Sequence, residues 1–180
     1  PLGLACLLAR NVLQHDGGTR YILICHPGWD HPTYIRARPK QLNHYVQCAQ
    51  YDPPFAALLE DLAVLPSHAD PQQTLLDETL VVSMGEFGRT PKVKADGGRD
   101  HWPKLSTLAF SGGGLPMGQV IGRSNRNAGE PASRPVSPED LFATILATMF
   151  DIGELRLLPE VPRDVARLIE RAQPIPELAG

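Results

Sequence analysis

The chain has 180 residues, and 17 lysines and arginines against 20 acidic residues give it a formal net charge of −3. A nearly balanced charge argues against a general nucleic-acid-binding domain, since such domains usually present a basic face. No apolar run approaches the roughly 20 residues of a membrane-spanning helix. The hydrophobic content of 42% excludes intrinsic disorder, and with 16 glycines and 18 prolines it indicates a globular chain with many loops.

The first segment, residues 2–14, has leucine and valine near helical spacing and is predicted to form a helix that ends at a Gly-Gly pair. It lacks a basic segment before it and a small-residue cleavage site after it, so we expect no signal peptide. The cysteines show no CxxC spacing and are expected to be buried free thiols, so they do not report a redox compartment. They are Cys6, Cys25 and Cys48.

Two short continuous apolar runs, residues 21–25 and 79–84, are typical of strands that are buried on both faces. Between them, helical sequence extends from about residue 40 to residue 65 and contains a pair of prolines at positions 53 and 54. At this pair either a new helix begins, capped by Asp52, or one helix kinks.

The second half of the chain predicts two further strands and two helices. The strands are expected at residues 105–110 and 119–121. Ser137 supplies a hydroxyl cap, followed by a proline in the first turn and an acid three residues after the cap, which predicts a helix that stops near Gly153. A last amphipathic helix is predicted at residues 162–171. This order of strands and helices favours an α/β layer fold with a mainly parallel sheet.

Two loops that follow predicted buried strands are rich in residues able to bind a metal ion. Ligands bind at the carboxyl ends of parallel strands, so we expect the two loops to converge. Carboxylate and imidazole groups suit a divalent ion such as zinc or manganese. Alternatively, each loop is an ordinary turn whose acids cap helices or hold the backbone. The candidates are His26, Asp30 and His31 in the first loop and Glu86, Asp96, Asp100 and His101 in the second.

Two arginines of the second loop, Arg89 and Arg99, suggest an anion site, because guanidinium groups donate in pairs to phosphate or sulfate. The alternative is that each pairs with a neighbouring acid, Glu86 or Asp100, and only holds the loop. The sequence contains no Gly-x-Ser-x-Gly, Walker, Gly-x-Gly-x-x-Gly or His-Glu-x-x-His motif. Residues 111–114, Ser-Gly-Gly-Gly after a predicted strand, form a turn or hold an anion through their backbone amides.

Five segments, in a fixed order, resemble a bacterial family that is catalogued as domain of unknown function 1501 and is abundant in planctomycetes. The resemblance extends from about residue 2 to residue 157. The segments are Gly28-Trp29-Asp30-His31, the run 77–91 with Gly-Glu-Phe-Gly-Arg-Thr-Pro, Gly98-Arg99-Asp100-His101-Trp102-Pro103, the run 105–122 and the run 135–145.

This family is similar to the alkaline phosphatase and sulfatase superfamily, which implies a three-layer α/β/α sandwich with a mainly parallel sheet. Residues 1–158 would be the C-terminal part of one such domain, without its N-terminal strand, and residues 159–180 the C-terminal helix and tail of the same domain. The metal would be zinc, calcium, magnesium or manganese. The expected metal ligands are Asp30, His31, Glu86 and His101, and the expected substrate-binding residues are Arg89, Arg99 and Asp100.

Two residues depart from the pattern that the resemblance implies. Phe87 follows Glu86 where a superfamily hydrolase would have histidine, so a second metal would lose a ligand. Pro32 stands where family members often have histidine, which leaves His31. The superfamily nucleophile belongs to a strand upstream of this chain. We therefore expect a longer parent protein to carry the activity.

The expected function is that of a metal-dependent hydrolase of phosphate or sulfate esters in this parent, with the present chain inactive alone. The ester would be a small molecule or a polysaccharide. The alternative is a non-catalytic binding or structural member of the superfamily. Self-association through an exposed sheet edge is also expected. An exported or periplasmic location is implied by the resemblance alone.

Overall fold

The structure is a computed structural model that describes residues 2–30 and 43–179. His31 and Pro32 lie outside the described residues. The chain has a mixed α/β fold in which helices accompany two small antiparallel sheets. No helix of the described part is long and apolar enough to cross a membrane. The elements are α1 Leu2–His15, α2 His44–Val64, α3 Leu75–Glu78, β1 Leu80–Met84, β2 Gly88–Arg89, β3 His101–Trp102, β4 Leu108–Gly112, α4 Pro138–Met149, α5 Ile152–Leu155, α6 Arg163–Arg171 and the 3-10 helix η1 Pro176–Leu178.

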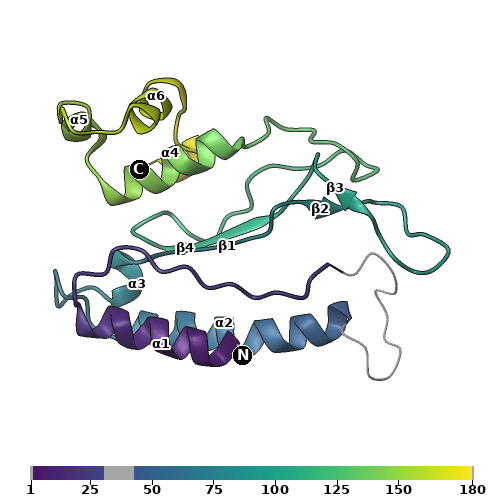
Figure 1. Cartoon of the computed structure of the whole chain (residues 1–180), viewed down its shortest axis with the longest axis horizontal. Helices are drawn as coiled ribbons and strands as arrows, with labels where there is room; N and C mark the ends of the chain where they lie inside the picture. The colour runs from purple at the N-terminus through teal and green to yellow at the C-terminus, as the bar shows by residue number, and fades with distance from the viewer. Residues whose placement is uncertain (1, 31–42, 180) are drawn as a thin grey trace.

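Helices α1 and α2 pack side by side and form one layer of the molecule (Figure 1). The core beneath them consists of Cys6, Leu58, Leu62 and Leu75, and Leu62 is fully buried. The predicted first helix is confirmed, and α2 continues without a break through the two prolines. The alternative of a new helix at this pair is therefore wrong. The burial of Cys6 agrees with the prediction of a free buried thiol, whereas Cys25 is exposed.

The predicted mainly parallel sheet is wrong, because both sheets are two-stranded and antiparallel. In the larger sheet, Leu80 of β1 pairs with Gly112 of β4 and Met84 pairs with Leu108. Parallel pairing requires a long crossover, usually a helix. The chain between β1 and β4 contains no helix, so it returns antiparallel. The third predicted strand thus lies at residues 108–112, and residues 119–121 form no strand.

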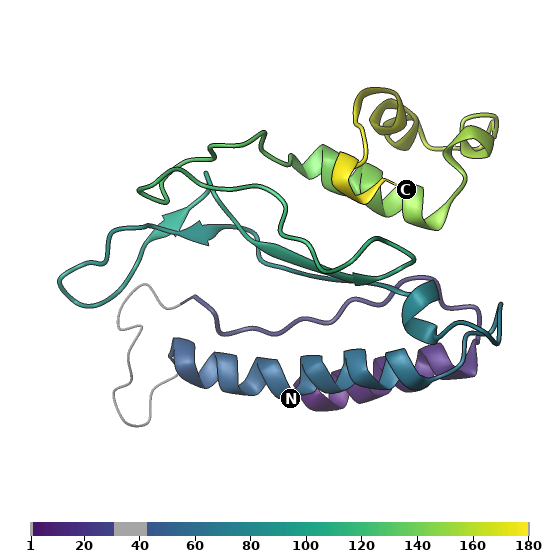
Figure 2. The same ribbon diagram turned by 180° about the vertical axis from the view of Figure 1, so that it is seen from behind.

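Residues 17–30 form an extended segment that runs between the α1–α2 layer and the β1–β4 sheet (Figures 1 and 2). Ile24 packs against the core, whereas Tyr21 and Leu23 are 76% and 70% exposed. No backbone hydrogen bond joins residues 19–26 to another described residue. The predicted strand at 21–25 is therefore extended but unpaired. It runs in the same direction as β1, so both chain segments arrive at the end of the molecule where β2 and β3 lie.

The C-terminal elements lie on the opposite side of the β1–β4 sheet from α1 and α2 (Figure 1). The predicted start of α4 is confirmed, since Ser137 and Asp140 form a capping box. The helix ends at Met149, and a separate short helix, α5, follows. The final helix is confirmed as α6. Beyond α6, the buried Ile175 donates its backbone N–H to Thr144 Oγ1 at 2.9 Å, which holds the tail on α4.

Candidate functional site

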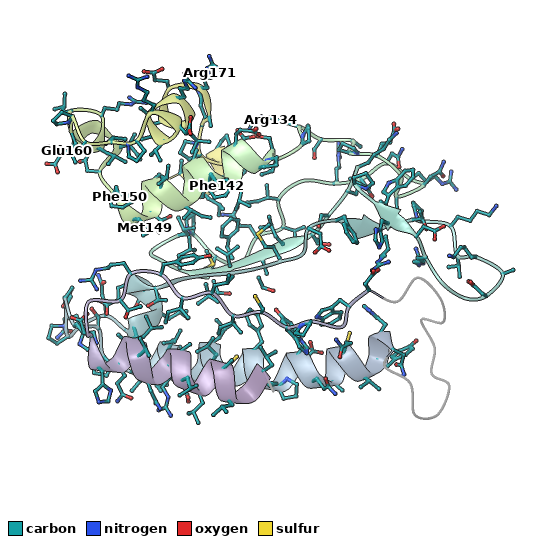
Figure 3. All side chains as sticks on the ribbon, in the orientation of Figure 1. Arg134, Phe142, Met149, Phe150, Glu160 and Arg171 are labelled. Carbon is teal, nitrogen blue, oxygen red and sulfur yellow. The ribbon has the colours of Figure 1, made fainter. Side chains whose placement is uncertain are left out.

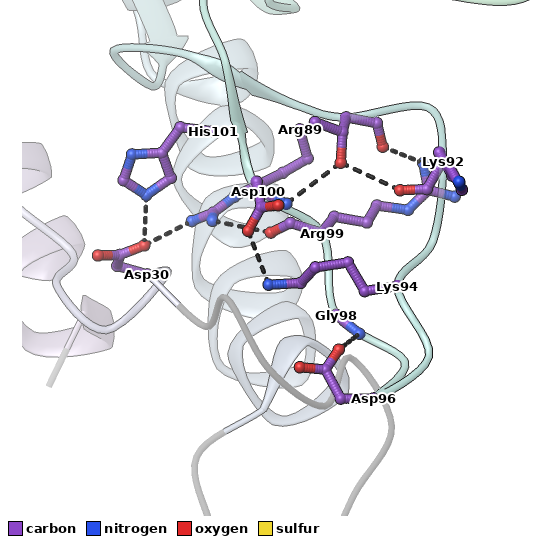
Figure 4. A network of polar contacts seen from close by, with 10 residues as sticks. Asp30, Arg89, Lys92, Lys94, Asp96, Gly98, Arg99, Asp100 and His101 are labelled. Carbon is purple, nitrogen blue, oxygen red and sulfur yellow. Dashed lines mark hydrogen bonds and ion pairs between the residues drawn. The ribbon is translucent and has the colours of Figure 1, made fainter.

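Asp30, Arg89 and His101 meet at one end of the molecule, although they lie in three separate parts of the chain (Figure 4). Asp30 Oδ1 lies 2.8 Å from His101 Nε2. The same oxygen accepts a hydrogen bond of 3.0 Å from Arg89 Nη2. Arg89 also donates to the Trp29 carbonyl at 3.1 Å and to the Arg99 carbonyl at 3.4 Å. The arginine therefore joins the loop that carries Asp30 to the loop that carries His101.

The position of Asp30 is determined by contacts between its loop and α2. The side chain of Gln47 is buried and donates to the Pro27 carbonyl at 2.7 Å. Gly28 has a φ of +97°, and a Cβ built on it would lie 2.6 Å from Gln47 Nε2, so glycine is required at this position for two reasons. Trp29 packs edge-on against Tyr51 of α2, with ring centroids 5.9 Å apart. These contacts hold the loop in place immediately before Asp30.

The positions of Arg89 and His101 are determined by the pairing of β2 with β3. Arg89 lies directly opposite His101 in the antiparallel register. The ring of Phe87 stacks on the imidazole of His101, with centroids 3.9 Å apart and planes inclined by 25°. Gly88 approaches the Leu105 backbone so closely that a Cβ would lie 1.9 Å from its carbonyl oxygen. Only glycine allows this approach, which places Arg89 opposite His101.

The loop between β2 and β3 is held together by its own charged side chains (Figure 4). Arg99 Nη1 donates to the Thr90 and Pro91 carbonyls at 2.7 and 2.9 Å. Lys94 Nζ donates to Asp100 Oδ1 at 2.7 Å. Two of the predicted substrate-binding residues, Arg99 and Asp100, therefore make their polar contacts within the loop. The sequence-based alternative was that each arginine pairs with Glu86 or Asp100. Instead, Arg99 donates to carbonyl groups and Asp100 pairs with Lys94.

The charges of the site favour an ionised Asp30. The hydrogen bond from His101 and then that from Arg89 hold the pKa of this carboxyl below its ordinary value. Likewise, the hydrogen bond to Asp100 raises the pKa of Lys94. Asp30 Oδ2 makes no hydrogen bond to a described residue. The carboxylate thus retains an oxygen for a further cation or donor.

The structure brings together two of the four predicted metal ligands. Asp30 and His101 are in contact, whereas Glu86 is exposed and bonded to neither of them, and His31 lies outside the described residues. Within residues 2–30 and 43–179, no group of three or more histidines, cysteines, aspartates or glutamates could hold a metal ion. His26, also a candidate from sequence, packs near Tyr51 with ring centroids 6.4 Å apart. The described part of the site therefore contains two of the predicted ligands, Asp30 and His101, and one arginine.

Sequence reasoning missed two residues that shape this site, and it missed the contact that a third, Phe87, makes with His101. Gln47 lies in the middle of a helix and gives no local signal of its bond to the Pro27 carbonyl. Lys94 lies six residues before Asp100 in a polar loop. This spacing does not predict a contact between two side chains unless the loop is known to be a hairpin. Phe87 drew attention only as a departure from a hydrolase pattern, although an aromatic residue beside a strand with histidine candidates is a signal of ring stacking.

The comparison with known families decides where this chain belongs. The family model described as "Protein of unknown function (DUF1501)" matches residues 2–176. The chain belongs to the DUF1501 family. The match covers all three residues of the site, and it confirms the family that the sequence motifs resemble. No curated protein and no solved structure matches the chain.

Proposed function

We propose that this DUF1501 chain forms part of a metal-dependent hydrolase of phosphate or sulfate esters within a longer protein. The observation that carries the proposal is the contact of Asp30 with His101 beside Arg89. A carboxylate, an imidazole and a guanidinium from distant segments form one exposed cluster. Metal-assisted ester hydrolysis can use this combination, because a bound cation and an arginine both stabilise negative charge on the ester oxygens.

The chemistry of the two ligands fits a divalent cation. Asp30 and His101 would hold it in place of the hydrogen bond that now joins them, since carboxylate oxygen and imidazole nitrogen are both ligands of zinc and manganese. Arg89 already donates both N–H groups of Nη2, to Trp29 and Asp30, and one N–H of Nη1. Its remaining N–H groups are the donors available to an ester anion. When bound, the metal would polarise the ester oxygen and orient the attacking nucleophile.

A resemblance to the alkaline phosphatase and sulfatase superfamily forms part of the proposal. Two observations support it: helices lie on both sides of the β1–β4 sheet, and residues 17–30 run in the same direction as β1 toward the site. Parallel α/β folds bind ligands where strands that run in the same direction end at one edge. Here the shared direction holds for residues 17–30 and β1, whereas β1 and β4 are antiparallel. A small-molecule or polysaccharide ester is the proposed substrate class.

The test uses the longer protein that contains this chain, purified with and without added zinc or manganese. We expect it to retain metal after dialysis and to hydrolyse an aryl phosphate or an aryl sulfate. Asp30→Asn and His101→Gln should each weaken metal binding at least tenfold, because each removes a ligand. Asp164→Asn and His15→Gln are matched controls on exposed helical residues and should leave binding unchanged. Metal-free protein without hydrolysis would contradict the proposal.

The second candidate function is that of a non-catalytic binding or structural domain. The observation in its favour is that the Phe87 ring stacks on one face of the His101 ring. Phe87 has no metal-binding group, although a superfamily hydrolase would have histidine at this position. Under this reading, Asp30, Arg89 and His101 only tie two loops together. The same experiment separates the two functions, because here the Asp30→Asn variant would lose thermal stability without any change in metal content or turnover.

We also propose that the chain associates with itself through the segment 17–30. The accessible surface of the whole chain is 12583 Å², whereas a compact monomer of 19.7 kDa would expose about 8,600 Å². No backbone–backbone hydrogen bond joins residues 19–26 to another described residue, and two apolar side chains there, Tyr21 and Leu23, face solvent. Such an edge accepts another strand. Sedimentation of the chain should show oligomers that Leu23→Lys disrupts, and a monodisperse monomer would contradict this.

A further inference from the structure

We propose that Phe87 is a positioning residue that orients the imidazole of His101 toward Asp30. The ring centroids of Phe87 and His101 are 3.9 Å apart and the planes differ by 25°, so the two rings lie face to face. Through this contact, Phe87 restricts the plane in which the imidazole can lie. The orienting role of Phe87 depends only on this geometry. A benefit to metal binding would also require that the proposed function is correct.

The need for such a residue follows from the exposure of His101. Its side chain is 49% exposed and belongs to a strand of only two residues. The hydrogen bond between Nε2 and Asp30 restrains one atom of the ring but leaves the ring free to rotate about that bond. A stacked aromatic ring removes this freedom, and such contacts prefer defined geometries. Phe87 and Asp30 together therefore determine both the position and the plane of the imidazole.

Phe87 also contacts the second group that binds Asp30. The guanidinium carbon of Arg89 lies 5.4 Å from the Phe87 ring centroid, within the range of a cation–π contact. A single aromatic ring thus touches both side chains that converge on the carboxylate. Because Phe87 immediately precedes β2, the pairing of β2 with β3 sets its position at the same time as those of Arg89 and His101. Loss of the ring should therefore disturb both partners of Asp30.

The experiment compares Phe87→Leu, which removes the ring, with Phe87→Tyr, which keeps it. The control is Phe142→Leu, the same change on the exposed face of α4 (Figure 3). The first readout is the proton NMR signal of the His101 ring, identified among six histidines by its absence in His101→Gln. The aromatic ring current of Phe87 should displace this signal. We expect Phe87→Leu to remove the displacement and also to weaken the nuclear Overhauser effect between the His101 ring and the Asp30 side chain, and Phe87→Tyr to retain both.

The second readout is the affinity for zinc or manganese, measured by calorimetry on the longer protein. Residues that orient a ligand typically change metal affinity by 10- to 100-fold, so we expect about a tenfold loss in Phe87→Leu and recovery in Phe87→Tyr. An undiminished Overhauser effect between His101 and Asp30 in Phe87→Leu would overturn the proposal, because the imidazole would then keep its position without the ring. A weakened effect with unchanged affinity would overturn the link to metal binding. If wild-type protein binds no metal, the proposed function fails and the NMR readout still decides the role of Phe87.

Discussion

Replacing Gly88 with alanine tests whether the site depends on one close backbone contact. A Cβ at this position would lie 1.9 Å from the Leu105 carbonyl oxygen and 3.0 Å from its carbonyl carbon. The obstructing atoms belong to the backbone, which cannot rotate away as a side chain can. Gly88→Ala must therefore displace β2 from the chain at Leu105, and with it Arg89.

The expected cost is at the upper end of the range for overpacking, about 3 kcal/mol, because an overlap of more than 1 Å exceeds what local adjustment absorbs. Gly17 offers a matched comparison, since a Cβ there meets no atom within 4 Å and its φ is not positive. Gly17→Ala should be neutral or stabilise the protein by about 0.4–1 kcal/mol, because alanine reduces the entropy of the unfolded chain. The same chemical change is thus expected to have opposite effects at two positions.

Urea denaturation of wild type, Gly88→Ala and Gly17→Ala measures the free energy of unfolding of each. We also expect Gly88→Ala to lose the proximity of Asp30 and His101, which a nuclear Overhauser effect between their side chains would report in the wild type. Equal unfolding midpoints for the two variants would refute the reasoning. So would a Gly88→Ala protein that keeps the Asp30–His101 contact, because the displacement of β2 would then not reach the site.

Three further predictions concern the core, the tail and the site carboxylate. Leu62→Ala, at a fully buried side chain, should cost about 2–5 kcal/mol of unfolding free energy, whereas Leu157→Ala, at an 83% exposed one, should change it by less than about 0.5 kcal/mol in urea titrations. Thr144→Val should leave the buried Ile175 N–H unpaired, cost about 1–3 kcal/mol and speed exchange of this amide with solvent, and unaltered exchange would contradict the bond. The lowered pKa of Asp30 means that its carboxylate contributes stability above its ordinary pKa of 3.8 and loses it as the pH falls through the lower folded value. Urea titrations should therefore show the difference between wild type and Asp30→Asn shrinking below about pH 4, and a difference independent of pH would contradict the ion pairs.

Elements whose signals lie within a few residues were predictable from sequence. The start of α4 depends on Ser137, the following proline and Asp140, and all three act within one helical turn. Helices α1 and α6 and strand β1 follow from the spacing of their apolar residues, as does the core position of Cys6. The residue types also marked Asp30, Arg89 and His101 as candidates before their contacts were known, whereas a metal site remains a prediction.

The partners of these elements depended on the path of the whole chain. The segment 21–25 has the composition of a buried strand, yet no backbone hydrogen bond joins it to another described residue, and β1 pairs with β4. The choice of Asp30 as the partner of His101, 71 residues away, is equally non-local. It arises because Gln47 holds one loop while the pairing of β2 with β3 holds the other. Local sequence thus determined which helices form and which side chains can bind a cation. The tertiary structure decided the direction of the strands and the grouping of Asp30, Arg89 and His101. The reason is that contacts between distant residues depend on how the intervening segments pack.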